Sequence, residues 1–146
     1  MGMKRVALGV VTVVGVGLLA VAPVRAHHAF ASEFDANRPM KITGALVKVD
    51  WTNPHTWFTF DVKGADGKVE RWMIETGAPA ALVRRGFSKD FLKPGTEVTV
   101  EGYLAKGVAR RANGRTMKFL DGKTLFVGSS GTGAPDDGKD PTETKK

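Results

Sequence analysis

The sequence predicts a mainly β protein: a small OB-like β-barrel of five to six strands, with one short helix between the third and fourth strands. Several short segments alternate apolar and polar residues, as strands with one buried face do. One helical segment interrupts them after the third strand. Glycines stand inside the first and fourth strands, where closing a sheet on itself requires bends. A half-open sandwich with the same order of elements is the alternative.

The first three strands form the predicted first half of the barrel. In the first strand the apolar phase changes near Gly44, and a glycine at such a point indicates a bulge or a bend. The second strand places Phe58 and Phe60 on one face and Trp57 on the other. An Asp-Gly turn joins it to the third strand. The three strands are expected at residues 40–51, 56–62 and 69–76.

A helix of about two turns follows. Pro79 suits its first turn, and Gly86 is a natural C-terminal stop. The Pro94-Gly95 turn then leads into the fourth strand, where Gly102 permits bending. A basic loop is expected at 105–114, and an Asp-Gly turn joins the last two strands. These later strands are expected at residues 97–104, 115–120 and 123–127.

The beginning of the chain predicts a secretory signal peptide. Lys4 and Arg5 precede an uncharged apolar run over residues 6–24, and Ala26 offers a small residue for cleavage. An uncleaved membrane anchor is the alternative, which the glycines and Pro23 disfavour. Cleavage after Ala26 predicts a periplasmic or secreted protein with no membrane span in its mature form.

The end of the chain is rich in Gly, Ser, Pro and charged residues, with no aromatic or aliphatic anchor. Such a segment buries too little apolar area to offset the entropy of ordering it. Cleavage of the signal would lower the formal charge from +7 to +4 by removing three basic residues, which is ordinary for a soluble protein. The expected organisation is a signal peptide at 1–26, an N-terminal arm at 27–38, the barrel domain at 39–128 and a disordered tail at 129–146.

Several classes of function are excluded. The 146 residues contain no cysteine, so a disulfide scaffold, a zinc finger and a thiol nucleophile are ruled out. The chain lacks a P-loop, a nucleophile elbow, an H-E-x-x-H motif and a dinucleotide fingerprint. Glu75 and Glu101 are interpreted as surface charges of strands. Whether the protein is an enzyme stays open, and only a bound metal ion would supply the chemistry.

The three histidines define the candidate site. Cleavage after Ala26 makes His27 the first residue, so that its α-amine and its ring can chelate one metal ion, and His28 adds a second ring. His55 follows an Asn-Pro turn that restricts its backbone. Amine and imidazole nitrogens suit Cu(II), Ni(II) and Zn(II), and copper binds tightest of these. We therefore predict a copper site formed by His27, His28 and His55.

Acidic residues are candidate partners for these ligands, either as oxygen ligands or as groups that orient the rings. Methionines 40, 73 and 117 offer thioethers to Cu(I), although packing in the core is their favoured role. The alternative is that the adjacent histidines only belong to a polar arm and His55 only hydrogen-bonds its turn. The candidate acidic partners are Glu33, Asp35 and Asp50.

Aromatic residues in outward phases predict a second kind of site. Trp51, Trp57 and Tyr103, together with several arginines, suit a glycan, a peptide or another anionic ligand. Nucleic acid is disfavoured as a partner because the protein is expected to be exported. Arg110 and Arg111 lie in the expected loop and are interpreted as solvated. The alternative function is therefore a periplasmic ligand- or protein-binding module with structural histidines.

The motifs together resemble one known family. They are His27-His28-Ala29-Phe30, Glu33-Phe34-Asp35, Trp51-Thr52-Asn53-Pro54-His55, and Lys93-Pro94-Gly95 before the fourth strand. The chain resembles a family of small exported bacterial proteins that is catalogued as a domain of unknown function. The resemblance covers about residues 26–128. It implies export and a small β-rich domain, and it implies no established activity.

Overall fold

The computed structural model describes residues 29–88, 90–137 and 140. The predictions for the signal peptide, its cleavage site, His27 and His28 lie outside the described residues. The elements in chain order are α1 (Ala29–Glu33), β1 (Phe34–Asp50), β2 (Trp57–Lys63), β3 (Val69–Glu75), α2 (Pro79–Arg84), β4 (Glu97–Ala105), β5 (Arg111–Phe119) and β6 (Thr124–Phe126).

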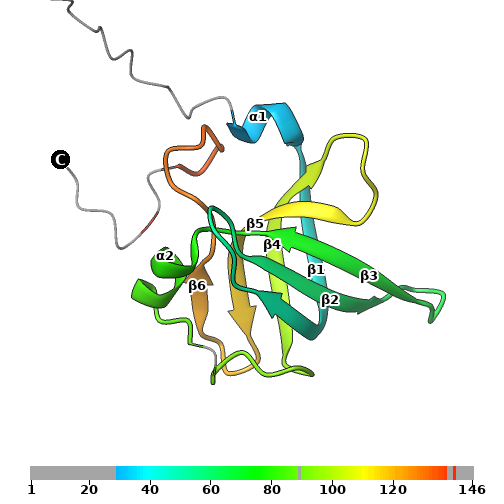
Figure 1. Ribbon diagram of the computed structural model, residues 1–146. Coiled ribbons are helices and arrows are strands. Elements are labelled where there is room, and N and C mark those ends of the chain that lie inside the picture. Colours follow the sequence, from blue (N-terminus) through cyan, green and yellow to red (C-terminus); the bar gives the residue numbers. More distant parts are fainter. Residues whose placement is uncertain (1–28, 89, 138–139, 141–146) are drawn as a thin grey trace, which may run out of the picture.

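The strands form one sheet whose two ends meet. Neighbours follow the order β3-β2-β1-β4-β5-β6, and each of these pairings is antiparallel. A further parallel pairing of β3 with β5 closes five strands into a ring, and β6 extends the sheet from β5 (Figure 1). The helix α2 lies between β3 and β4 along the chain. The prediction of a mainly β, OB-like fold is therefore confirmed.

The long strand β1 has two partners. Its first part pairs with β4, its last part pairs with β2, and Ala45 pairs with both. Gly44 lies at this change of partner, where an added Cβ would come within 2.7 Å of the Asp61 carbonyl oxygen. On β4, a Cβ at Gly102 would come within 1.9 Å of the Asn113 carbonyl oxygen. Both glycines therefore allow a close backbone approach, at the strand positions where the sequence predicted bends.

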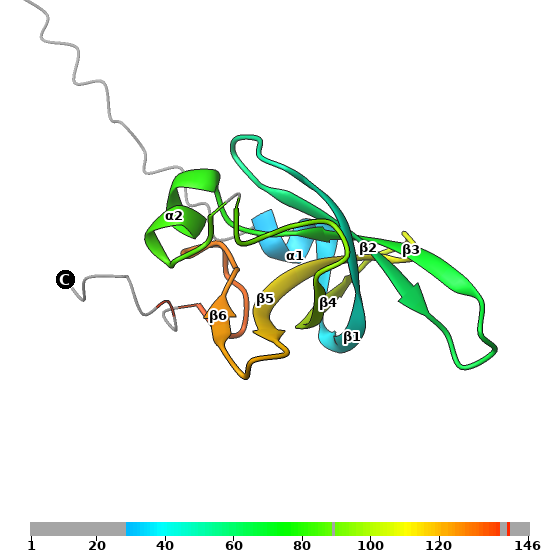
Figure 2. The ribbon, with the colours of Figure 1, turned by 90° about the horizontal axis from the view of Figure 1, so that it is seen from below.

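The main core fills the inside of the ring. Phe58 and Phe60 of β2 stack with ring centroids 6.2 Å apart, and both are buried as the alternation predicted. Leu82 of α2 is also fully buried in this core, which holds the short helix against the sheet. The β2–β3 hairpin extends beyond the ring (Figure 1, Figure 2). Met40 and Met117 belong to the core as predicted, whereas Met73 is exposed on the outer face of β3.

A second, smaller apolar cluster lies outside the ring. Phe30 of α1 and Phe34 of β1 pack with Ala105 and Ala134, and Tyr103 packs against them. The expected N-terminal arm at 27–38 thus contains α1 and the start of β1. We call the cluster of Phe30, Phe34, Ala105 and Ala134 the outer cluster.

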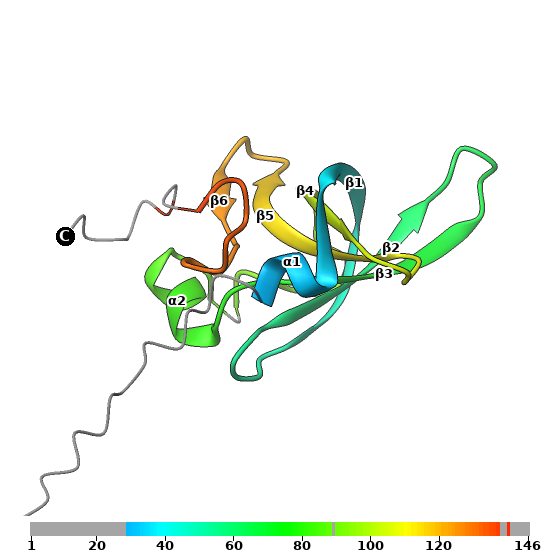
Figure 3. The same ribbon diagram turned by 90° about the horizontal axis from the view of Figure 1, so that it is seen from above.

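The C-terminal segment, which we define as residues 128–137, contributes to this outer cluster. Ala134 is buried there, and the Phe30 amide donates to the Thr132 carbonyl oxygen at 3.3 Å. Figure 3 shows α1 beside this segment. The predicted disordered tail concerned residues 129–146, and these contacts fall within that range. Sequence analysis did not anticipate them because they join groups far apart in the chain.

The start of β5 differs from the prediction. Residues 105–114 were expected to form a basic loop, but β5 begins at Arg111. Residues 111–113 pair with β3 on one side, and 112–114 pair with β4 on the other. The pairing with β4 is that of a hairpin, whereas the pairing with β3 joins residues 38 positions apart, so no local alternation announces it. In the described part of the chain, no helix has the length and apolar character needed to cross a membrane.

Candidate functional site

His55 lies just before β2, at one end of the ring. Its backbone carbonyl accepts a hydrogen bond from the Thr52 hydroxyl at 2.9 Å. The next residue, Thr56, exchanges backbone hydrogen bonds with Gly77 and Thr76, so the chain at His55 is held on its C-terminal side. The His55 side chain is 31% exposed. The ring is therefore held at the surface, as expected from the turn before it.

The buried carboxylate of Glu75 holds the His55 ring. Glu75 Oε1 lies 2.6 Å from His55 Nδ1, which is hydrogen-bonding distance, and the Glu75 side chain is only 7% exposed. Glu75 was interpreted as a surface charge, and this was wrong. Its outward phase on β3 was read correctly, but residues from α1 and β5 cover it. With Nδ1 engaged, Nε2 is the ring nitrogen that can coordinate a ligand.

Arg111 lies on the other side of Glu75. Its guanidinium is 2.7 Å from Glu33 Oε2 and 3.6 Å from Glu75 Oε2. It also lies 4.9 Å from the centre of the Trp57 ring, a cation–π distance. The interpretation of Arg111 as a solvated loop residue was wrong, because β5 carries it to the covered outer face. Its neighbour Arg110 is exposed and pairs with Glu70.

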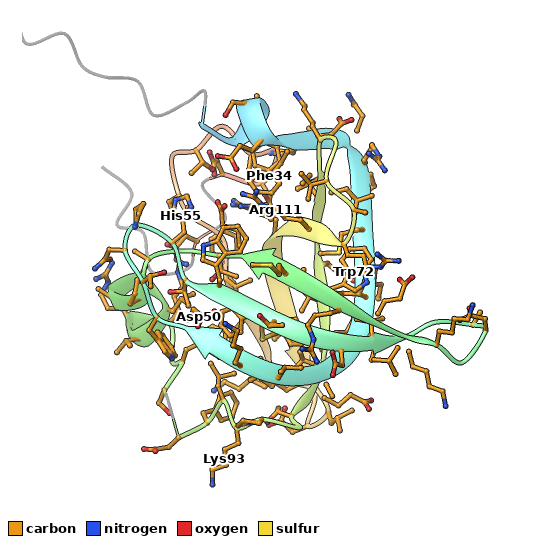
Figure 4. The ribbon with its side chains drawn as sticks, turned by 45° about the vertical axis from the view of Figure 1, so that its right-hand side comes forward. Phe34, Asp50, His55, Trp72, Lys93 and Arg111 are labelled. Carbon is orange, nitrogen blue, oxygen red and sulfur yellow. The ribbon has the colours of Figure 1, made fainter. Side chains whose placement is uncertain are left out.

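These residues form one connected group, which we call the Glu75 cluster: Glu33, His55, Trp57, Glu75 and Arg111. Figure 4 shows His55, Arg111 and Phe34 at the same end of the molecule, with Lys93 at the opposite end. With a neutral imidazole, the cluster holds two carboxylates and one guanidinium. Its formal charge is then negative, which favours a cation beside it.

Burial raises the pKa of the Glu75 carboxyl above its usual value, because the charged form loses solvation. The neighbouring His55 acts against this rise, and the Glu33 carboxylate adds to it. Arg111 also favours the charged form. Glu75 is thus a carboxylate whose ionisation depends on its basic neighbours.

Buried polar atoms next to the cluster lack hydrogen-bond partners among the described residues. Three of them are Thr56 Oγ1, Arg111 Nε and Asn113 Oδ1. Thr56 follows His55 in the chain, and Asn113 is the strand partner of Glu75 on β5. Unpaired buried polar atoms are rare in proteins, so these atoms are hydrogen-bonding groups left unused near His55, Glu75 and Arg111.

The candidate acidic partners have different environments. Glu33 belongs to the Glu75 cluster through Arg111. Asp35 accepts a hydrogen bond from the Asn37 amide at 2.9 Å, and Asp50 pairs with Lys48 at 2.7 Å. Among the described residues, the Glu33 side chain alone of the three is connected to His55 by ion pairs, through Arg111 and Glu75. In the part of the chain that the structure describes, no group of three or more His, Asp or Glu side chains is arranged to hold a metal ion.

The three candidate aromatic residues each pack against a different group. Trp51 is half-buried against the main core, and Trp57 contacts Arg111. Tyr103 meets Phe30 edge-on with ring centroids 5.5 Å apart. Tyr103 also lines a shallow groove of about 570 Å³ between β1, β4 and the C-terminal segment. The aromatic surface predicted from the sequence is therefore divided among three environments.

Sequence reasoning missed Glu75 and Arg111. A signal for Glu75 was present, since it shares the outward face of β3 and pairs in register with Trp57. The signal for Arg111 was absent, because the pairing of β3 with β5 joins residues that lie 38 positions apart. Only closure of the ring brings Arg111 to Glu75.

Comparison with known proteins agrees with the resemblance seen in the motifs. No curated protein matches the chain. A family model, described as a family of unknown function (DUF6152), matches residues 16–114. That range includes His27, His28 and the whole Glu75 cluster. The chain therefore belongs to the DUF6152 family.

Proposed function

We propose that this protein is an exported, periplasmic metal-binding protein, that copper is its metal, and that His27, His28 and His55 bind it. The observation that carries the proposal is the environment of the His55 ring. A buried carboxylate engages Nδ1 while the ring stays partly exposed, which leaves Nε2 as the nitrogen to coordinate a metal ion. Metal-binding histidines commonly have this arrangement, in which a carboxylate orients the ring and raises its basicity.

The position of α1 supports the other two ligands. His28 directly precedes Ala29, the first residue of α1. Glu33, the last residue of α1, is tied through Arg111 to the Glu75 cluster. Five residues of chain span at most about 18 Å, so His28 is tethered within that distance of Glu33. The arm is therefore attached at the same end of the molecule as His55.

The chemistry of the donors favours copper. A free terminal amine and imidazole rings are nitrogen ligands that rank Cu(II) above the other divalent metals of the first row. Unperturbed amine and imidazole groups have pKa values of ~7.7–8.0 and ~6.5, so both are available near neutral pH. With a neutral His55 ring, the negative formal charge of the Glu75 cluster adds an electrostatic attraction for the ion.

The test begins with the secreted protein. Mass spectrometry establishes its first residue, and a Cu(II) titration followed by electron paramagnetic resonance reports affinity and nitrogen ligands. We expect tight binding that weakens when one alanine is placed before His27 and when His55 is replaced by alanine. Lys93→Ala, at the opposite end of the molecule, is the control and should bind like the wild type. Unchanged spectra for both site variants would refute the proposal.

The second candidate function is a module that binds a ligand or a protein, with the histidines structural. The groove beside Tyr103 favours it, because its volume suits a small ligand. Tyr103→Ala should then weaken capture of that ligand while the domain stays folded. Loss of the fold in this variant would instead assign Tyr103 to packing against Phe30.

A further inference from the structure

We propose that the C-terminal segment positions the N-terminal arm for metal binding, with Asp136 and Asp137 as its anchors. This inference rests on the proposed function, because the arm carries His27 and His28. Neither aspartate belongs to the Glu75 cluster. Their effect on binding would therefore pass through α1.

The anchor point is Arg115 of β5. Its side chain is only 3% exposed, and it donates from Nε to Asp136 at 2.6 Å and from Nη2 to Asp137 at 3.1 Å. Its Nη1 donates to the Ser129 carbonyl at 3.0 Å. The guanidinium also lies 4.9 Å from the centre of the Phe126 ring. A buried cation needs such partners, so these contacts tie the segment to the sheet.

Asp137 connects this anchor to the part of the segment that meets α1. Its carboxylate accepts hydrogen bonds from the Thr132 hydroxyl at 3.4 Å and from the Gly133 amide. The Thr132 carbonyl in turn accepts from the Phe30 amide, and Ala134 packs in the outer cluster with Phe30. A continuous path therefore runs from Arg115 through Asp137 to the first turn of α1.

The helix α1 depends on such contacts. It has five residues, and a helix of this length is not stable in water by itself. Glu33 at its end is held by Arg111, and the Glu33 carbonyl accepts from the Lys106 amide at 2.8 Å. The start of α1 is held by the C-terminal segment at Phe30, only two residues after His28. The segment thus restrains the N-terminal end of α1, which directly follows His28 in the chain.

Restraining the arm lowers the entropy lost when its ligands bind a metal ion. We therefore expect Asp136→Asn with Asp137→Asn to weaken Cu(II) binding about ten-fold, although every proposed ligand is kept. Hydrogen exchange of residues 30–34 in the metal-free protein should accelerate in the same variant. The matched control is Asp66→Asn with Asp121→Asn, which removes the same charge from two exposed turns.

Two measurements on the secreted protein decide the inference. Exchange in α1 that equals that of the control overturns it, because the segment then does not hold α1. Faster exchange with unchanged Cu(II) affinity also overturns it, because positioning then does not affect binding. If the wild type binds no copper, the proposed function fails and this inference fails with it. The exchange data still report separately whether the segment restrains α1.

A second variant covers the case in which the double variant does not fold. Ala134→Asp places a charge in the outer cluster and leaves Arg115 with both of its aspartates. It should accelerate exchange in α1 and weaken Cu(II) binding in the same way. Wild-type exchange and wild-type affinity in a folded Ala134→Asp protein would overturn the inference.

Discussion

At the scale of single residues, Glu75 governs the geometry of the candidate site. Its carboxylate contacts His55 on one side and faces Arg111 on the other. Each of these neighbours favours the charged form, and burial opposes it. The orientation of the imidazole and the stability of the fold therefore depend on the same carboxylate.

The raised pKa of Glu75 predicts a pH dependence of stability. A carboxyl whose pKa is higher in the folded than in the unfolded protein stabilises the fold at pH values below its unfolded pKa. This contribution is lost as the pH rises through the folded pKa. Relative to Glu75→Gln, the wild type should lose stability as the pH rises above the ordinary glutamate pKa of 4.5 and through the raised folded pKa. Urea denaturation at a series of pH values measures this difference.

Glu101 supplies the matched control with the opposite sign. The hydrogen bond and the charge of Lys41 lower the pKa of Glu101 in the folded protein. The ion pair therefore stabilises the fold at pH values above the unfolded pKa, and this contribution is lost as the pH falls through the folded pKa. Relative to Glu101→Gln, the wild type should gain stability as the pH rises. If the free energy of unfolding of the wild type and of Glu75→Gln changed with pH in the same way, the raised pKa of Glu75 would be contradicted.

Arg111 predicts a contrast between adjacent arginines. Arg111→Gln removes the cation between two carboxylates and the contact with Trp57, and we expect it to lower the free energy of unfolding by about 1–3 kcal/mol. Arg110→Gln removes only an exposed pair with Glu70 and should cost less than about 1 kcal/mol. Chemical denaturation of both variants tests this, and equal costs would argue against the role of Arg111 between the two carboxylates.

At the scale of elements, the contact between β4 and β5 depends on glycine. The bulge after Glu101 brings the two backbones together at Gly102. No side chain fits there, because the Asn113 carbonyl lies where a Cβ would stand. Strand β5 thereby reaches the position at which it also pairs with β3.

Gly102→Ala should therefore destabilise the protein strongly, by about 3 kcal/mol. Gly107→Ala is the matched control, since a Cβ there meets nothing within 4 Å and only its positive φ opposes the change. We expect the control to cost about 1 kcal/mol. Thermal or urea unfolding compares the two, and a Gly102→Ala protein as stable as the control would contradict the close approach.

At the scale of the whole molecule, two apolar clusters of unequal size hold the chain. The main core joins the strands of the ring with α2, whereas the outer cluster has four buried residues that join α1, β1, β4 and the C-terminal segment. Fewer buried apolar contacts mean a smaller free energy of local opening. The outer cluster and the elements it holds should therefore open before the ring.

Native-state hydrogen exchange tests this order. The Phe30 and Gly133 amides, bound to Thr132 and Asp137, should exchange well before the β1 and β4 amides of the ring. The protein as purified serves as its own reference, because both groups are measured in one sample. Equal protection of the two groups would mean that the outer cluster and the ring unfold as a single unit.

Local patterns were enough to predict the class of fold and most of its elements, but not α1 or the start of β5. Alternation places Phe58 and Phe60 inward, Pro79 begins α2, and Gly44 and Gly102 lie where backbones approach. Such features depend on neighbours along the chain and on the steric limits of single residues, so they can be read before folding. The outward phase of Glu75 and the surface position of His55 were readable for the same reason.

Long-range closure decided the environment of the site. The parallel pairing of β3 with β5 brings Arg111 to Glu75, and packing of Phe30 and Phe34 brings Glu33 to both. Burial and ion pairing are properties of the surroundings, and here the surroundings come from segments that are distant in sequence. A strand pattern shows that a carboxylate points outward, but only the folded chain shows whether water or another element covers it.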